Sequence, residues 1–315
     1  MQPWRHYLPV LRRLMRAGLH VAGVALLIAL SVMTVQARAE QTSRAANPAP
    51  GELIDIGDGQ LLHLRVWGEA NDRPTILLDV SAAQPSSIWA WIARDLSADY
   101  RVVAYDRPGM AWSAGVPGRD AQSAAYALGR ALEAAGIGPP YVMVGHSFGG
   151  LSARVFAADH RADVRGLVLL DTTHPDPGGG TGFAAIYRSE AWRGHSGLLQ
   201  VFPPDNWYTS LPAEESAGAY AVTLWTSHLD ATAEEMEAWD ASVAEVQAAG
   251  DFGEMPLLVV SSAGTPDELN VQRDIATLSS RSRFVALDTS HMAMLMEQAA
   301  AAETAAQIRA FLTSL

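Results

Sequence analysis

The sequence predicts an α/β protein whose mostly parallel sheet carries helices on both faces. From Gly51 onward, apolar runs of strand length alternate with helical stretches of about 10–15 residues, a pattern typical of βαβ units. One long segment, 172–255, interrupts this alternation. The chain has 315 residues, of which 49% are hydrophobic, so it can form one large domain with a sizeable core.

The predicted strands and helices follow one another in a regular order. Residues 53–56 and 61–67 flank Gly57-Asp58-Gly59 and predict a hairpin. Four strands then follow, at 74–79, 101–105, 141–144 and 164–170. The helices between them are predicted at 88–96, at 121–135 and from the glycine-rich motif at 145–150 to about residue 160. After residue 255 the alternation resumes, with strands at 256–261 and 283–287 and helices at 271–278 and 303–312.

The interrupting segment, 172–255, is predicted to be a helical lid inserted between two strands of the sheet. Its clearest helix spans Asp230 to Ala249, with Thr232 and Glu235 as a capping box at its start. The segment holds thirteen acidic residues and two arginines, and such charge above a cavity entrance would disfavour anionic substrates. The core is then expected to comprise 52–171 and 256–315.

The N-terminal segment has the pattern of an export signal. Arginines precede an uncharged run from Ala17 to Ala37, and Ala37-Arg38-Ala39 forms a small-x-small cleavage pattern. Residues 1–39 are therefore predicted to be a signal peptide or, because the run approaches the roughly 20 residues that span a bilayer, a membrane anchor. Residues 40–51 are expected to form a linker. The protein is then exported, periplasmic or secreted, and contacts a membrane only through this segment, if it is retained.

The composition excludes several classes of function. The formal net charge is −12 and the chain has no lysine, so nucleic-acid binding is not expected. It has no cysteine, which excludes disulfides, thiol nucleophiles and thiolate metal sites. No metal-ligand cluster is visible in the sequence, and neither a metal nor another cofactor is expected. The expected partner is a small-molecule substrate.

The motif that carries chemistry is Gly145-His146-Ser147-Phe148-Gly149, a G-x-S-x-G sequence. It lies between a predicted strand and a small-residue helix, the context in which a serine on a sharp strand-to-helix turn is exposed as a nucleophile. The hydroxyl then stands at the carboxyl end of the sheet, where open α/β sheets bind ligands. Ser147 is therefore the predicted nucleophile.

A serine needs a base, and the base needs a carboxylate to orient it. We predict His291 as the base because it follows the last predicted strand, so that its loop reaches the same sheet edge as Ser147. Two carboxylates end neighbouring strands at that edge. Asp171 follows the strand at 164–170, and Asp267 follows the strand at 256–261. The sequence leaves both open as the third residue, with Asp288 as the next candidate.

These residues resemble the lid-bearing α/β-hydrolase superfamily, from about Glu52 to the C-terminus. The turn Asp106-Arg-Pro-Gly-Met-Ala-Trp-Ser113 is similar to the D-x-x-G-x-G-x-S turn of that superfamily, with Ala111 where a second glycine is usual. The run 167–175, Leu-Val-Leu-Leu-Asp-Thr-Thr-His-Pro, resembles the strand end that leads into the lid. The order serine, acid, histidine along the chain also fits.

The resemblance implies the α/β-hydrolase fold and acyl transfer to water by a serine hydrolase with a Ser-His-Asp triad. It also implies an oxyanion hole formed by the backbone N–H groups of Phe148 and Ala82. The expected substrate is a carboxylic ester of a small molecule with an apolar group, which the tryptophans and methionines of the lid favour. The alternatives are hydrolysis of lactones, amides or C–C bonds, perhydrolysis, or a non-catalytic binding protein on the same fold.

Overall fold

The computed structural model describes residues 8–115, 118–176 and 179–315. Its centre is an eight-stranded sheet in the order β1-β2-β4-β3-β5-β6-β7-β8. The strands are β1 (Glu52–Gly57), β2 (Gln60–Trp67), β3 (Thr75–Asp79), β4 (Val102–Tyr105), β5 (Tyr141–His146), β6 (Val164–Leu170), β7 (Leu257–Ser261) and β8 (Ser282–Ala286). Strands β3 to β8 run parallel to one another, and β2 pairs antiparallel with both β1 and β4. The predicted mostly parallel sheet is confirmed.

The central strands are buried on both faces, and their side chains alternate between two hydrophobic cores. On β3, Leu77 points to one core and Ile76 and Leu78 point to the other. On β5, Met143 and Val144 separate in the same way. This alternation follows from the two-residue period of a strand, and it requires a helical layer on each face.

Helices cover both faces, as predicted. The first core includes side chains of α3 (Ala121–Ala134), α4 (Gly149–Asp159) and α10 (Pro266–Ala276). The second core includes side chains of α2 (Ala90–Leu96), α11 (Ala293–Met296) and α12 (Gln298–Leu312), together with the 3₁₀ turn η2 (Ser86–Trp89). Helix α10 begins earlier than predicted because Thr265 and Glu268 form a capping box at its start. The helix was predicted to begin only at residue 271, after this cap.

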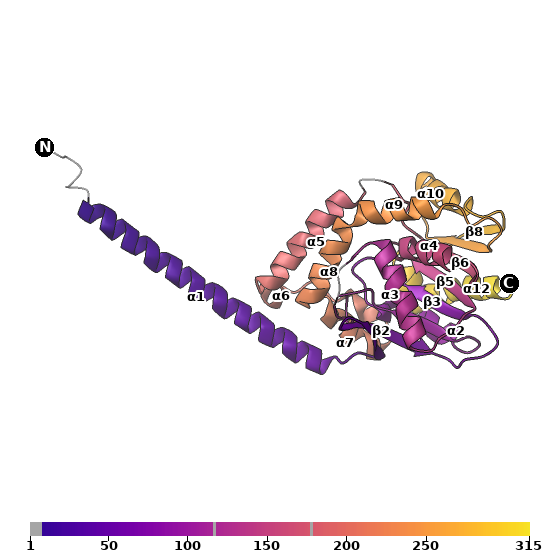
Figure 1. Cartoon of the computed structure of the whole chain (residues 1–315), viewed down its shortest axis with the longest axis horizontal. Helices are drawn as coiled ribbons and strands as arrows, with labels where there is room; N and C mark the ends of the chain where they lie inside the picture. Colours follow the sequence, from indigo (N-terminus) through magenta and orange to yellow (C-terminus); the bar gives the residue numbers. More distant parts are fainter. Residues whose placement is uncertain (1–7, 116–117, 177–178) are drawn as a thin grey trace.

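Between β6 and β7 the chain forms an insertion in which every regular element of the described residues is helical. Its elements are α5 (Gly180–His195), α6 (Leu198–Val201), η3 (Trp207–Ser210), α7 (Ala213–Val222), α8 (Thr226–Glu237) and α9 (Trp239–Ala249). In Figure 1, α5, α6 and α8 lie to one side of the sheet, and α9 returns toward it.

The single helix predicted over Asp230 to Ala249 is wrong, because the chain breaks between α8 and α9 at Ala238. The predicted capping box is also wrong. Thr232 lies inside α8 and donates a hydrogen bond to the His228 carbonyl oxygen at 2.8 Å, and Glu235 is buried against Arg107. Glu235 pairs with Arg107, which is distant in the sequence, and a local sequence pattern cannot encode such a long-range ion pair.

Helix α1 (Leu8–Ala46) projects away from the domain as one long helix (Figure 1). It is long and apolar enough to cross a membrane, and the apolar window is not buried against the protein. Residues 40–46, predicted as the first part of a linker, continue this helix. The helix persists because its last turns pack on the insertion, where Glu40 accepts a hydrogen bond from the Thr226 backbone N–H at 2.9 Å.

Candidate active site

Ser147 lies on a tight turn between β5 and α4 and adopts a left-handed backbone conformation, with φ of 52°. The flanking glycines permit the turn. A Cβ atom at Gly149 would lie 2.4 Å from the Val80 carbonyl oxygen, and one at Gly145 would lie 2.6 Å from the Gly149 carbonyl oxygen. Since backbone atoms on both sides leave no room, only glycine fits at either position. The strain at a non-glycine residue with positive φ is typical of functional sites.

His291 and Asp171 form a short hydrogen bond, with 2.5 Å between His291 Nδ1 and Asp171 Oδ2. Asp171 also has positive φ, 40°, and accepts hydrogen bonds from the Ser262 hydroxyl at 2.7 Å and the Ser262 backbone N–H at 3.2 Å. Burial by itself raises the pKa of the Asp171 carboxyl. The hydrogen bonds from His291 and Ser262 have the larger, opposite effect, so the pKa is lowered to about 2. The carboxylate is therefore ionised at neutral pH and can fix the orientation of the imidazole.

The structure brings Asp171 to His291 and leaves the two other candidate acids elsewhere. Asp267 is exposed in the first turn of α10. Asp288 is exposed in the loop after β8. Of the three carboxylates that the sequence left open, Asp171 is the one that is hydrogen-bonded to the imidazole in the described part of the chain.

His146, the neighbour of Ser147, supports the His291 loop. It is fully buried, its ring centroid is 4.5 Å from that of His291, and its Nε2 lies 3.0 Å from the His291 carbonyl oxygen. Burial, with the nearby His291, lowers the pKa of His146 to about 3, so the ring is neutral and Nε2 donates the hydrogen bond. His146 was not among the site residues predicted from the sequence.

Ser147 and His291 line one cavity of about 330 Å³. Phe148 and Ala82 line it too, so all the residues predicted for nucleophile, base and oxyanion hole meet there. The other lining residues are mostly large and apolar: Ser81, Gln84, Thr173, Phe183, Tyr187, Trp207, Met236, Trp239 and Met292. None of the described lining residues is acidic. The cavity can therefore hold an apolar group beside the serine hydroxyl.

Several acidic side chains of the insertion pair with arginines of the core, and none lines the cavity among the described residues. Glu214 and Glu215 of α7 bind Arg94 and Arg65 of the core, and Glu234 of α8 binds Arg119. The negative charge of this segment thus joins the insertion to the core. Because no acidic residue is among the described residues that line the cavity, the lining does not support the expected repulsion of anionic substrates.

Arg107 holds the loop that carries Ala82 through hydrogen bonds to its backbone. This guanidinium donates hydrogen bonds to the carbonyl oxygens of Val80 and, at 3.1 Å, of Ser81. A trans peptide directs its C=O and N–H in opposite directions. The hydrogen bond from Arg107 to the Ser81 carbonyl oxygen therefore orients the Ala82 N–H away from Arg107. The buried carboxylate of Glu235, on α8, binds Arg107 in turn, with 2.6 Å between Oε1 and Nε.

His228 of α8 holds the next residue of the same loop. Its Nδ1 accepts a hydrogen bond from the Ala111 backbone N–H at 3.1 Å, so its Nε2 carries the proton and donates to the Ala83 carbonyl oxygen at 3.1 Å. Ala83 has φ of 60° and needs such support. His228 was not among the site residues predicted from the sequence, since no local pattern marks it for this role.

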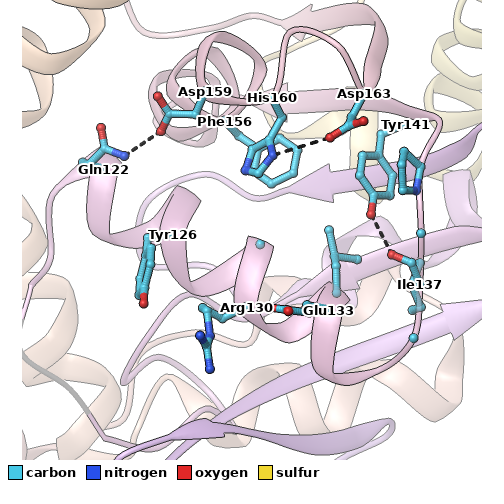
Figure 2. A pocket seen from close by; sticks show the side chains of 15 residues that line it. Gln122, Tyr126, Arg130, Glu133, Ile137, Tyr141, Phe156, Asp159, His160 and Asp163 are labelled. Atoms are coloured by element: carbon cyan, nitrogen blue, oxygen red, sulfur yellow. Dashed lines mark hydrogen bonds and ion pairs between the residues drawn. The ribbon is translucent and has the colours of Figure 1, made fainter.

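A second and larger hollow, of about 610 Å³, lies between α3 and α4 (Figure 2). It borders Tyr141 at the start of β5, whereas Ser147 follows the end of that strand, so the two sites lie at opposite ends of the sheet. Its polar groups pair with one another: Gln122 donates to Asp159 at 2.7 Å, and the Tyr141 hydroxyl donates to the Ile137 carbonyl oxygen at 2.6 Å. Despite its size, this hollow offers no nucleophile and base together.

Comparisons with known proteins agree with the observed fold. A model of the alpha/beta hydrolase fold matches residues 81–194. The enol-lactonase from Burkholderia xenovorans is 24% identical over 82% of this chain and 99% of its own, with a TM-score of 0.61. The Cif epoxide hydrolase from Acinetobacter nosocomialis is 15% identical over 89% of this chain and 96% of its own, with a TM-score of 0.69. A membrane phospholipase A is 22% identical over 96% of this chain and 98% of its own, with a TM-score of 0.58.

Curated relatives match a smaller part. An AB hydrolase superfamily protein of Gibberella zeae is 34% identical over 110 residues, which are 33% of this chain and 34% of that protein. An uncharacterized protein of Schizosaccharomyces pombe is 30% identical over 151 residues, 39% of this chain and 28% of that protein. This chain spans about a third or less of the length of these relatives. The resemblance to the α/β-hydrolase superfamily is confirmed, and the solved structures establish the fold.

The buried histidine of α8 predicts a specific loss of stability in acid. Burial lowers the pKa of His228 from 6.5 to about 4, so the unfolded chain takes up a proton at this residue before the folded one does. The contribution of neutral His228 to the free energy of unfolding is fully present above pH 6.5 and is lost as the pH falls toward 4. In urea titrations, His228→Asn should reduce the difference in unfolding free energy between pH 6.5 and 4.5 by about 2 kcal/mol. An unchanged difference would contradict the assignment of a neutral His228.

Proposed function

The chain has the fold of the α/β-hydrolase superfamily, and we propose that it is a serine hydrolase that cleaves a carboxylic ester of a molecule with an apolar group. The observation that carries this proposal is the meeting of a strained Ser147 and the His291–Asp171 pair at one apolar cavity. A binding protein without activity would not need a serine in this conformation or a hydrogen-bonded imidazole and carboxylate beside it.

In the proposed reaction, the Ser147 hydroxyl attacks the ester carbonyl while His291 Nε2 accepts its proton. Asp171 holds the Nδ1 side of the imidazole and stabilises the imidazolium that forms. The imidazolium then gives its proton to the leaving alcohol, and an acyl-enzyme remains on Ser147. Water, activated by His291, hydrolyses this intermediate and restores the free serine.

The tetrahedral intermediate bears a negative oxygen, which the backbone N–H groups of Phe148 and Ala82 are proposed to bind. Both residues line the cavity beside Ser147. Loss of one such donor typically costs about 3 kcal/mol of transition-state stabilisation. The insertion contributes indirectly, because Glu235 and His228 hold the loop of Ala82 in place.

The names of similar structures favour ester chemistry. They include a thermophilic esterase from Thermogutta terrifontis and a membrane phospholipase A, both acting on esters by name. The enol-lactonase from Burkholderia xenovorans keeps lactone hydrolysis as the second candidate, since a lactone is a cyclic ester. The epoxide hydrolases share the fold, but the serine at the strand-to-helix turn supports acyl transfer here.

Helix α1 supports a further part of the proposal, namely that the hydrolase domain lies outside the cytoplasm on a retained membrane anchor. Arginines at the start favour a cytoplasmic N-terminus. Gln36 is buried, 4% exposed, so residues before the Ala37-Arg38-Ala39 pattern already contact the domain. The intact mass of the protein extracted from membranes is expected to be that of the uncleaved chain. A soluble protein that begins at Glu40 would contradict retention.

Ser147→Ala tests the nucleophile. The variant should lose hydrolysis of p-nitrophenyl esters and labelling by a fluorophosphonate probe, because only the attacking hydroxyl is removed. Its melting temperature should stay close to that of the wild type. Near-wild-type turnover in the variant would end the serine-hydrolase proposal.

Asp171→Asn and Asp267→Asn form a matched pair that tests the acid. Asn at 171 cannot hold the imidazole in the required tautomer, and a comparable change in another triad lowers kcat about 10⁴-fold. Asp267→Asn removes the same charge from an exposed position near the sheet edge and should leave kcat within about twofold. Equal losses in both variants would refute the role of Asp171, as would full activity of Asp171→Asn.

A further inference from the structure

Exposed apolar side chains gather on the insertion. Outside α1, eleven large hydrophobic residues are exposed in the described chain, and six of them lie between residues 183 and 207. Three surround the turn that joins α5 to α6: Trp192, Val201 and Phe202, which are 63%, 66% and 65% exposed. Residues 196–204 contain no charged side chain. We call this region, residues 192–204, the α5–α6 tip. Soluble surfaces rarely concentrate apolar groups in this way.

The tip lies beside helix α1. A Cβ atom on Gly197, in the α5–α6 turn, would be 3.1 Å from the side chain of Val32. The uncharged run of α1 from Ala17 to Ala37 is about 30 Å long at 1.5 Å per residue, which matches the hydrocarbon thickness of a bilayer. Val32 lies roughly 8 Å before the end of this run. If α1 spans a bilayer, the tip therefore stands at its surface, at the depth where interfacial helices and tryptophans bury apolar side chains.

The cavity of Ser147 opens on the same insertion. Phe183 and Trp207 line the cavity and are also 50% and 45% exposed, so they form part of its mouth. Helix α5 runs from this mouth to the tip, and Phe183 and Trp192 are about 14 Å apart along its axis. A long apolar chain can thus pass from the lipid surface toward the nucleophile along α5, whose Arg188 and Arg193 are each paired with a carboxylate.

We propose that the α5–α6 tip docks on the bilayer that α1 spans, and that the substrate is a long-chain ester drawn from that bilayer. The choice of substrate rests on the proposed serine hydrolase, whereas the docking does not. A second copy of the chain is the competing occupant of the tip. The bilayer is favoured because the tip is continuous with a helix whose apolar window is exposed along its length.

The absence of cysteine allows a direct test in the full-length chain. Phe202→Cys and, as a matched control, Tyr126→Cys are each labelled with a nitrobenzoxadiazole fluorophore and reconstituted in phosphatidylcholine vesicles. Tyr126 is equally exposed, 65%, but lies on α3. The label at 202 should shift to the blue and be quenched by nitroxide-bearing lipids, and the label at 126 should do neither. A label at 202 without lipid quenching, whether in water or against a second copy, overturns the docking.

Kinetics test the substrate. The double variant Trp192→Ser/Phe202→Ser should lower hydrolysis of a long-chain fluorogenic diester in vesicles about tenfold, because the docked state is lost. Its turnover of water-soluble p-nitrophenyl acetate should match that of Tyr126→Ser and of the wild type. Equal loss on both substrates would overturn the lipid-ester assignment. A wild type that hydrolyses neither ester would refute the proposed hydrolase, while the fluorescence result would still decide the docking.

Discussion

The buried guanidinium of Arg107 is the contact on which the rest of the site depends. It pairs with Asp79 at the end of β3 and with Glu235 on α8, and all three side chains are almost fully buried. Burial opposes the charge on Arg107, but the two carboxylates outweigh it and raise the pKa, so the ion pair persists. Removal of one partner from such a buried pair typically costs 3–5 kcal/mol, because it leaves an uncompensated charge.

This contact makes the insertion part of the support of the proposed active site. The same guanidinium that binds Glu235 also holds the backbone of Val80 and Ser81, which precede the proposed oxyanion donor. His228, on the same helix, holds Ala83. Helix α8 thus lines the cavity through Met236 and supports the loop of the proposed oxyanion donor, so a shift of α8 would move that loop.

Helix α1, which is long and apolar enough to cross a membrane, continues this chain of contacts. Its Glu40 accepts hydrogen bonds from the backbone and hydroxyl of Thr226, the first residue of α8, and its Arg44 binds Ser227. Carboxylates are favourable at this end of a helix, where backbone N–H groups lack partners. Helix α1 and the loop near Ser147 therefore both contact α8, so the proposed anchor and the proposed site are joined through one helix.

The sequence by itself determined the alternating sheet and helices, the strained turn of Ser147 and the position of His291, because each rests on local periodicity or on a short motif. It also placed Asp171 and Asp267 at one sheet edge, yet it could not choose between them. That choice belongs to the tertiary structure, since Asp171 and His291 are 120 positions apart. The break between α8 and α9 and the pairing of Glu235 with Arg107, 128 positions away, have the same origin. Contacts over such separations depend on packing, which no local pattern encodes.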